Sequence, residues 1–97
     1  MRHELILSPQ AVRDSRAFPA HLRAELRDRL EEHLRREPTR LSRSRVKSSR
    51  GLGRPQYRLR IGDIRVFYDV EGAEVHVLTI ITKELAERWL ESHGVAE

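Results

Sequence analysis

The feature that most constrains the fold is a run of alternating apolar and polar residues in the C-terminal half of the chain. Segments Tyr57–Ile61 and 64–70 alternate with period two, and Gly62-Asp63 between them is typical of a tight hairpin turn. A second turn at 71–73 leads into Glu74–Thr82, where apolar residues on both faces indicate a central strand. The sequence therefore predicts three consecutive antiparallel strands.

The N-terminal part of the chain has the period of an α-helix instead. Leu22, Leu26, Leu30 and Leu34 recur at every fourth residue, which places them on one stripe of a helix. Acidic residues stand four positions before basic ones along the same segment, which is the favourable order for ion pairs on a helix. Because Pro38 cannot continue a helix, the sequence predicts that this one ends before it.

Shorter signals complete the expected order of elements. The apolar segment 5–7 predicts a strand, and Ser8-Pro9 then predicts an N-capped helix over Pro9–Arg16. Thr82 is expected to cap a C-terminal helix that stops at Gly94. The expected fold is α+β: a small, mainly antiparallel sheet in the order β-α-α-β-β-β-α, with two N-terminal helices packed on one face and a short C-terminal helix.

Composition narrows the class of protein. A chain of 97 residues has room for one small core, so we expect a single domain over residues 1–97. The absence of cysteine excludes disulfides, a cysteine nucleophile and thiolate metal sites. The first ten residues lack the pattern of a signal peptide, and no segment approaches the ~20 apolar residues of a membrane span. The expectation is a cytoplasmic protein without a membrane contact.

The basic residues are concentrated in the middle of the chain. All but Lys47 and Lys83 of the 19 basic residues are arginine, and the net charge is +4. No acidic residue occurs between Glu37 and Asp63. The basic residues in that interval are Arg40, Arg43, Arg45, Lys47, Arg50, Arg54, Arg58 and Arg60. The rest of the chain is therefore acidic overall, and the basic segment indicates an anionic partner.

Three arginines share one face of the predicted hairpin. Alternation places Arg58 and Arg60 on the side away from the core, and pairing across the turn brings Arg65 beside Arg60. Guanidinium groups this close repel one another and offer forked donors to phosphate oxygens, which favours a polyanionic ligand. Phe67 falls on the same face and offers a surface on which bases stack. The alternative is a solvated basic face in which Asp69 pairs with Arg65.

Segment 39–55 is rich in serine, glycine and arginine and shows no period, so we expect a flexible basic loop. Its cations would capture a phosphate backbone electrostatically, or they are simply solvated. The expected RNA-binding residues are Arg43, Arg45, Lys47, Arg50 and Arg54, together with Phe67. The five histidines share no ligand spacing, so no metal is expected, and no cofactor-binding motif is present.

Segment 55–68 has the pattern Pro-x-Tyr-Arg-Leu-Arg-x-Gly-Asp-x-Arg-Val-x-Tyr and resembles the hairpin of the RelE/ParE superfamily of bacterial type II toxins. The helices before it, the Val-His-Val-Leu-Thr-Ile segment at 75–80 and the final helix match in order. The resemblance therefore covers nearly the whole chain. It implies a small sheet with two N-terminal helices on one side, and a cognate antitoxin that wraps and silences the toxin.

In its RelE branch the resemblance implies a ribosome-dependent endoribonuclease that cuts mRNA without a metal or cofactor. A ribose 2′-OH attacks the adjacent phosphate, and cations stabilise the charge that builds on the phosphate oxygens. By position, Arg58 and Arg60 match strand cations of the family, Arg65 matches the arginine after the turn, and Lys83 lies near the basic position that opens the last helix. The implied partners are the antitoxin, the ribosome and mRNA, with operator DNA bound only through the antitoxin.

The sequence is also compatible with two other functions. Arginine does not act as a base, because its pKa exceeds ~12. The tyrosine or histidine that active ribonucleases of the family often carry on the last helix has no counterpart in segment 82–90, which offers Lys83, Glu84, Glu87 and Trp89. This difference favours a ParE-type inhibitor of DNA gyrase without nuclease activity. The third reading is an inactive toxin that serves as antitoxin partner and co-repressor.

Overall fold

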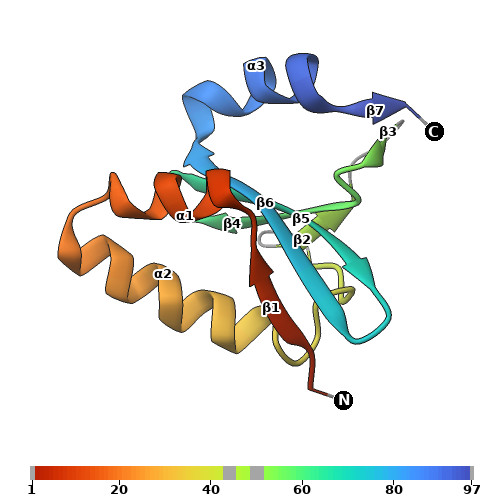
Figure 1. The fold of residues 1–97 in the computed structure, drawn as a ribbon, viewed down its shortest axis with the longest axis horizontal. Coiled ribbons are helices and arrows are strands. Elements are labelled where there is room, and N and C mark those ends of the chain that lie inside the picture. Colours follow the sequence, from red (N-terminus) through yellow and green to blue (C-terminus); the bar gives the residue numbers. More distant parts are fainter. Residues whose placement is uncertain (1, 43–45, 49–51, 97) are drawn as a thin grey trace.

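Five strands form one mixed sheet in the computed structural model, which describes residues 2–42, 46–48 and 52–96 (Figure 1). The elements are β1 (Glu4–Leu7), α1 (Pro9–Arg16), α2 (Ala20–His33), β2 (Val46–Ser48), β3 (Leu52–Arg54), β4 (Tyr57–Ile61), β5 (Ile64–Glu71), β6 (Glu74–Thr82), α3 (Lys83–His93) and β7 (Val95–Ala96). The sheet order is β1-β6-β5-β4-β2, with β1 parallel to β6 and the other neighbours antiparallel. The α+β architecture is as predicted.

Segment 39–55 contains two short strands that the sequence did not predict. β2 pairs with β4, with Val46 opposite Leu59, and the Val46 side chain is buried. β3 pairs with β7 near the C-terminus as a separate two-stranded sheet. Strands of three residues are too short to show a period, and a partner distant in sequence holds each of them. The prediction of a loop is therefore wrong for these two strands.

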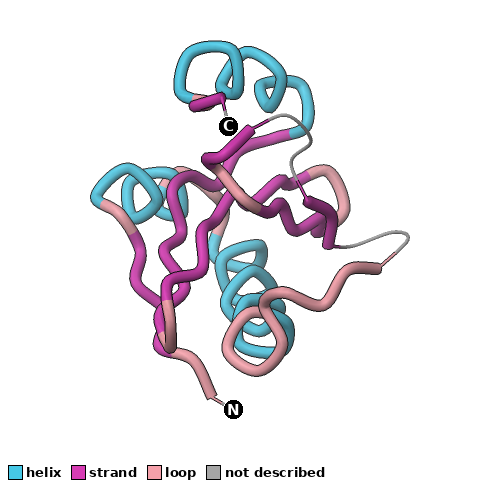
Figure 2. Tube along the Cα trace, turned by 90° about the vertical axis from the view of Figure 1, so that its right-hand side faces the viewer, coloured by secondary structure: helices cyan, strands magenta, loops and turns pink. Residues whose placement is uncertain are grey.

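Helices α1 and α2 cover one face of the sheet, and the hydrophobic core lies between the two layers (Figure 2). The leucine stripe of α2 provides much of that core, since Leu26, Leu30 and Leu34 are nearly or fully buried. Burial of each such side chain stabilises the fold by about 1.5–3 kcal/mol. The facing side chains of the sheet include Leu59, Val66, Tyr68, Val75 and Val77.

Polar contacts fix α1 to the central strand β6. A register shift between Phe67 and Tyr68 leaves Leu78 as an extra residue in β6. The Ser8 hydroxyl, which caps α1, donates to the carbonyl of Leu78 at 2.8 Å. The Asp14 carboxylate accepts the backbone N–H of Ile80 at 3.0 Å and also the hydroxyl of Thr79. Backbone groups that the bulge takes out of the ladder are thus satisfied by α1.

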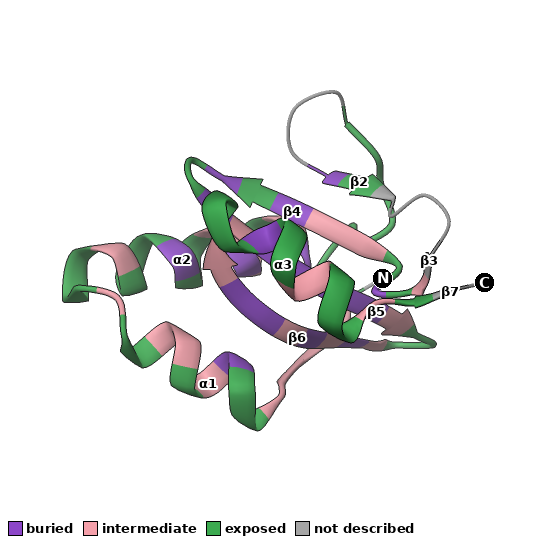
Figure 3. Cartoon of the chain, turned by 90° about the horizontal axis from the view of Figure 1, so that it is seen from above, coloured by how far each residue is buried: buried purple, intermediate pink, exposed green. Residues whose placement is uncertain are grey.

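Helix α3 lies across the opposite face of the sheet (Figure 3). Its Trp89 ring stacks on Phe67 with ring centroids 5.1 Å apart, and Ala86 is buried beneath the helix. Leu85, in contrast, is 47% exposed. None of the helices in the described part of the chain is long and apolar enough to cross a membrane.

Candidate nucleic-acid interface

Four cations line up on the face of the sheet that α1 and α2 do not cover. In the strand register Lys47 lies opposite Arg58, and Arg60 lies opposite Arg65. Leu59, which alternates with the two β4 arginines, is fully buried on the other side. The prediction that Arg58, Arg60 and Arg65 share a face is confirmed, and strand β2 adds Lys47 to them. We call these four residues the cationic face.

The cationic face lacks counter-ions. Among the residues that the structure describes, the side chains of Lys47, Arg58 and Arg60 have no hydrogen-bond or ion-pair partner. Within the same described residues, the Arg65 guanidinium donates only to two backbone carbonyls of its own hairpin, at 2.8 and 3.1 Å. Donors that extend into solvent without a carboxylate partner are available to an anionic ligand.

The titration of Arg65 reflects this crowding. Partial burial lowers the pKa of Arg65, and the like charges of Arg60 and Arg58 lower it further, while Asp63 and Glu84 act in the opposite direction. Such a shift means that the protonated form is destabilised in the free protein. An anion bound between these side chains would remove that destabilisation.

Asp69 does not pair with Arg65, so the solvated-face alternative loses its proposed ion pair. Asp69 is 3% exposed, and its carboxylate accepts the backbone N–H of Gln56 at 2.7 Å. Its neighbouring cation is Arg54, whose Nε lies 3.9 Å away and whose Nη2 lies 3.3 Å from Glu71. Arg54, predicted to bind RNA, belongs to this carboxylate cluster and not to the cationic face.

Phe67 lies on the predicted face, opposite Arg58, but the prediction that it offers an open stacking surface is wrong. Its side chain is 0% exposed because Trp89 covers it with nearly parallel rings. His93 stacks in turn on Trp89, with centroids 4.9 Å apart. The three rings form a stack that extends outward from the sheet, and His93 is its exposed member.

His93 is a residue that the sequence reasoning did not assign to the site. The signal was present, since His93 follows Trp89 by four residues and therefore lies on the same helix face. Its Nδ1 is 3.2 Å from the carbonyl oxygen of Trp89. The tautomer with hydrogen on Nδ1 donates to that carbonyl and leaves Nε2 with a free lone pair.

Lys83 stands at the start of α3, beside the hairpin turn. Its Nζ is 3.4 Å from the carboxylate of Asp63, and its backbone N–H donates to the Asp63 carbonyl at 2.8 Å. It is half exposed and lies at the turn that separates Arg60 from Arg65. The remaining predicted RNA-binding residues, Arg43, Arg45 and Arg50, lie outside the described residues.

One group of side chains in the described part of the chain has the composition of a metal site. Ligand atoms of Glu71, Glu74 and His76 lie within 4.8 Å of one another at the end of the β5–β6 hairpin. Spacing along the sequence did not predict this group, because strand pairing brings it together. Arg54 contacts Glu71 and supplies positive charge to the same cluster.

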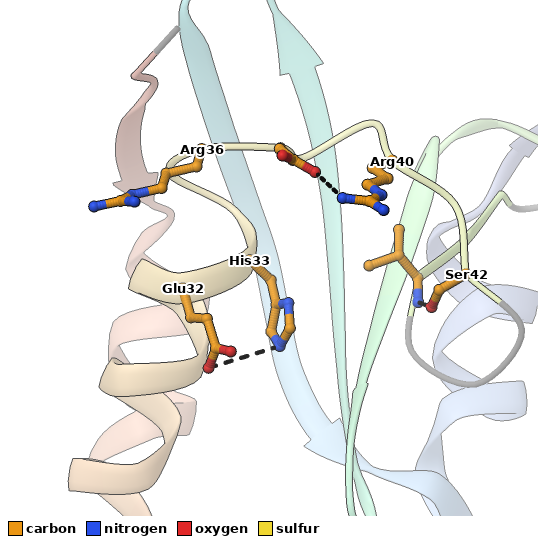
Figure 4. A pocket seen from close by; sticks show the side chains of 7 residues that line it. Glu32, His33, Arg36, Arg40 and Ser42 are labelled. Atoms are coloured by element: carbon orange, nitrogen blue, oxygen red, sulfur yellow. Dashed lines mark hydrogen bonds and ion pairs between the residues drawn. The ribbon is translucent and has the colours of Figure 1, made fainter.

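A cavity of about 390 Å³ lies between the end of α2 and β2 (Figure 4). Acidic and basic side chains both line it, and Glu37 accepts a hydrogen bond from Arg40 at 2.8 Å. This bond holds the pKa of Glu37 below its usual range. The Arg36 side chain points away from His33 in Figure 4, so these cations do not converge on a common anion.

Residues 5–84 match the family model of the ParE toxin of the type II toxin–antitoxin system parDE. No curated protein matches the sequence.

Solved structures share the fold. The toxin–antitoxin complex RelBE2 from Mycobacterium tuberculosis is 21% identical, with 84% of this chain and 99% of that chain covered and a TM-score of 0.67. The RelB–RelE complex from Methanococcus jannaschii is 19% identical, with 87% and 96% covered and a TM-score of 0.66. The archaeal RelE–RelB complex from Pyrococcus horikoshii OT3 is 27% identical, with 86% and 97% covered and a TM-score of 0.63.

The family match spans most of the chain, and the helix and strand arrangement agrees with the RelE structures. The hairpin motif of segment 55–68, with segment 75–80 and the order of the helices, predicted the same superfamily from the sequence. The chain therefore belongs to the ParE toxin family of type II toxin–antitoxin systems, within the RelE/ParE superfamily.

Proposed function

We propose that this toxin inhibits translation by cutting messenger RNA on the ribosome. The observation that carries the proposal is the cationic face, where none of the four cations has a counter-ion among the described residues. A row of arginines with free forked donors matches the regularly spaced phosphates of a single RNA strand. The toxin would act in the cytoplasm and would contact operator DNA only through its antitoxin.

The reaction we propose is an internal transesterification. The ribose 2′-oxygen forms a bond to phosphorus while the bond from phosphorus to the 5′-oxygen of the next nucleotide breaks. The products are a 2′,3′-cyclic phosphate and a 5′-hydroxyl. Arg58, Arg60 and Arg65 would contact the phosphate oxygens and stabilise the charge that develops there. No cofactor enters this scheme.

Proton transfer needs a group other than arginine. His93 is the outer member of the ring stack that begins at Phe67, and Phe67 is the cross-strand neighbour of Arg58. The Nε2 atom of His93 would accept the 2′-hydroxyl proton. Lys83 is ten residues earlier in α3, about 15 Å away along the helix axis, so it would hold a different phosphate. The 5′-oxygen would take its proton from water or from a ribosomal group.

The second candidate is inhibition of DNA gyrase without nuclease activity. The match to the ParE toxin model favours it specifically. The cationic face also fits this function, because the phosphates of a gyrase-bound DNA segment are anions as well. The inactive toxin, which would act only as antitoxin partner and co-repressor, is the remaining alternative.

Induced expression separates these three functions. We expect growth arrest, new 5′ ends inside translated messages, and no DNA breaks. The Arg58→Ala/Arg60→Ala variant should lose both effects, whereas the matched variant Arg13→Ala/Arg16→Ala, which removes two cations from α1, should keep them. Growth arrest with DNA breaks and intact transcripts would favour gyrase, and normal growth would favour the inactive toxin.

His93→Gln tests the assignment of the proton acceptor. Glutamine retains a polar side chain but does not accept a proton near neutral pH, so cleavage should slow by roughly 10²–10⁴-fold while RNA binding is kept. Cleavage at the wild-type rate would show that His93 does not take the proton.

A further inference from the structure

The turn end of the β5–β6 hairpin holds two carboxylates and an imidazole that face one another. We propose that Glu71, Glu74 and His76 bind one Zn²⁺ ion or a similar divalent transition metal, with a fourth coordination position left to water. Glu71 is four residues beyond Phe67, the cross-strand neighbour of Arg58, which is about 13 Å along β5. The site is therefore apart from the cationic face, and the inference does not depend on the proposed cleavage of RNA. It departs from the sequence-based expectation that no metal is bound.

The distances between the ligand atoms match those around a small metal ion. The Nε2 atom of His76 is 3.1 Å from a carboxylate oxygen of Glu74 and 3.7 Å from one of Glu71. All three ligand atoms lie within 4.8 Å of one another. Zinc–ligand bonds of about 2.0–2.2 Å in a tetrahedron place neighbouring ligand atoms about 3.3–3.6 Å apart. An ion therefore fits between the three side chains with small movements of their ends.

Hydrogen bonding alone satisfies only part of this arrangement. The Nε2 atom of His76 carries at most one hydrogen, and its 3.7 Å separation from Glu71 exceeds hydrogen-bond distance. Glu71 and Glu74 also lie directly opposite each other in the strand register, where like charges destabilise a sheet. An ion that binds both carboxylates and the imidazole removes this repulsion.

The charge of the cluster also fits a divalent cation. Asp69, buried beside Arg54 on the same hairpin face, adds a third carboxylate. With His76 neutral, these three carboxylates and the Arg54 guanidinium have a formal charge of −2. A bound Zn²⁺ ion balances that charge.

Arg54 fixes the orientation of one ligand. Its Nη2 atom is 3.3 Å from Oε1 of Glu71, so that Oε2 is the oxygen that faces His76. Carboxylates that bind metals are commonly held in this way by a hydrogen-bonded partner. An imidazole beside two carboxylates selects metals of the zinc type over Ca²⁺ and Mg²⁺, which prefer oxygen ligands alone. The three ligand side chains are partly exposed, so an ion can enter from solvent.

The ion would fasten the hairpin turn. It would connect the end of β5 to the start of β6 across Gly72, whose φ of +58° places it in the left-handed region. Small domains with a limited core often gain stability from a disulfide or a metal, and this chain has no cysteine. The role we infer for the metal is therefore structural.

Calorimetric titration of the purified full-length toxin with Zn²⁺ tests the inference. The chain is first freed of metal with EDTA, and about one ion per chain should then bind. Glu71→Gln, Glu74→Gln and His76→Gln should each weaken binding at least about tenfold, because each removes one of the three protein ligands. The matched controls Glu87→Gln and His21→Gln remove an exposed carboxylate and an exposed imidazole elsewhere, and should change the dissociation constant less than about twofold.

Thermal unfolding gives a second measurement. Because the three ligands converge only in the folded chain, Zn²⁺ at about 100 times its dissociation constant should raise the Tm by up to about 10–20 °C. His76→Gln should lose most of this shift, while circular dichroism confirms that the variant is folded. Co²⁺ in place of Zn²⁺ should give the strong visible absorption of tetrahedral coordination.

Three results would overturn the inference. If the wild-type chain binds no Zn²⁺, the cluster is an ion-paired surface only. If the three glutamine variants bind Zn²⁺ as tightly as wild type, the ion is held elsewhere. If the two controls weaken binding as much as the ligand variants do, the binding is nonspecific.

Discussion

Replacing Arg58 and Arg60 by alanine removes half of the cationic face, and we expect this change to halve the salt dependence of RNA binding. The strand register assigns four cations to the face, Lys47, Arg58, Arg60 and Arg65. Each cation that neutralises a phosphate of single-stranded RNA displaces a condensed counter-ion, which contributes about 0.7 to the slope of log K against log salt. The slope therefore reports how many of these residues contact the backbone.

The expected values follow from that count. Four contacts give a slope of about −2.8, so affinity falls about 50-fold between roughly 50 and 200 mM salt. Two contacts give about −1.4 and a fall of about 7-fold over the same range. If bases stack on the ring stack, this stacking contributes to affinity in wild type and variant alike and does not change the slope.

Fluorescence anisotropy with a labelled single-stranded RNA of about 12 nucleotides measures both slopes. Arg13→Ala/Arg16→Ala removes the same charge from α1 and should leave the slope near that of wild type. Equal slopes for wild type and Arg58→Ala/Arg60→Ala would show that these two arginines do not contact phosphate. Equal reductions in both double variants would show that only net charge matters.

Three further predictions concern the framework that holds the site. Asp14→Ala should lower the free energy of unfolding by roughly 2–4 kcal/mol in urea titrations, because the buried Thr79 hydroxyl and Ile80 N–H lose their acceptor. Asp28 is exposed, so the control Asp28→Ala should change the free energy of unfolding by less than about 0.5 kcal/mol. Burial raises the pKa of Tyr68 above its ordinary value of 10.0, so its contribution to the free energy of unfolding is complete below pH 10 and is lost as the pH rises further. Tyr68→Phe should remove this loss of stability at alkaline pH. The variant should also be about 1 kcal/mol less stable at neutral pH, because it lacks the hydrogen bond to the Pro38 carbonyl. Trp89→Ala should destabilise the fold by about 2 kcal/mol and speed hydrogen exchange throughout α3, and unchanged exchange would mean that the stack on Phe67 does not hold the helix.

Local sequence signals were sufficient where a long period or a specific turn was present. The alternation through β4 and β5 and the two-residue turn at Gly62-Asp63 define a register, and this register places Arg65 beside Arg60. Ser8-Pro9 likewise predicts the start of α1, because a serine cap and a proline at the first position act through local geometry. These features do not depend on distant parts of the chain.

The errors arose where distant contacts decide the structure. Lys47 was predicted to bind RNA from a loop, but it lies in a three-residue strand that pairs with β4, and nothing within that strand indicates the pairing. Phe67 was expected to be open, but its burial depends on which face of the sheet α3 covers, and a helical period does not state this. The sequence likewise did not indicate that Arg54, which we predict to bind RNA, lies beside Asp69 and Glu71.

Programmed ribosomes give the most direct test of whether the toxin cuts RNA at the cationic face. Purified toxin is added to ribosomes that carry an end-labelled message with a defined codon in the A site, and gyrase supercoiling is measured in parallel. We expect one cut within that codon, a 2′,3′-cyclic phosphate at the new 3′ end, loss of the cut in Arg58→Ala/Arg60→Ala, and unaffected gyrase. An intact message together with inhibited supercoiling would show that gyrase is the target instead.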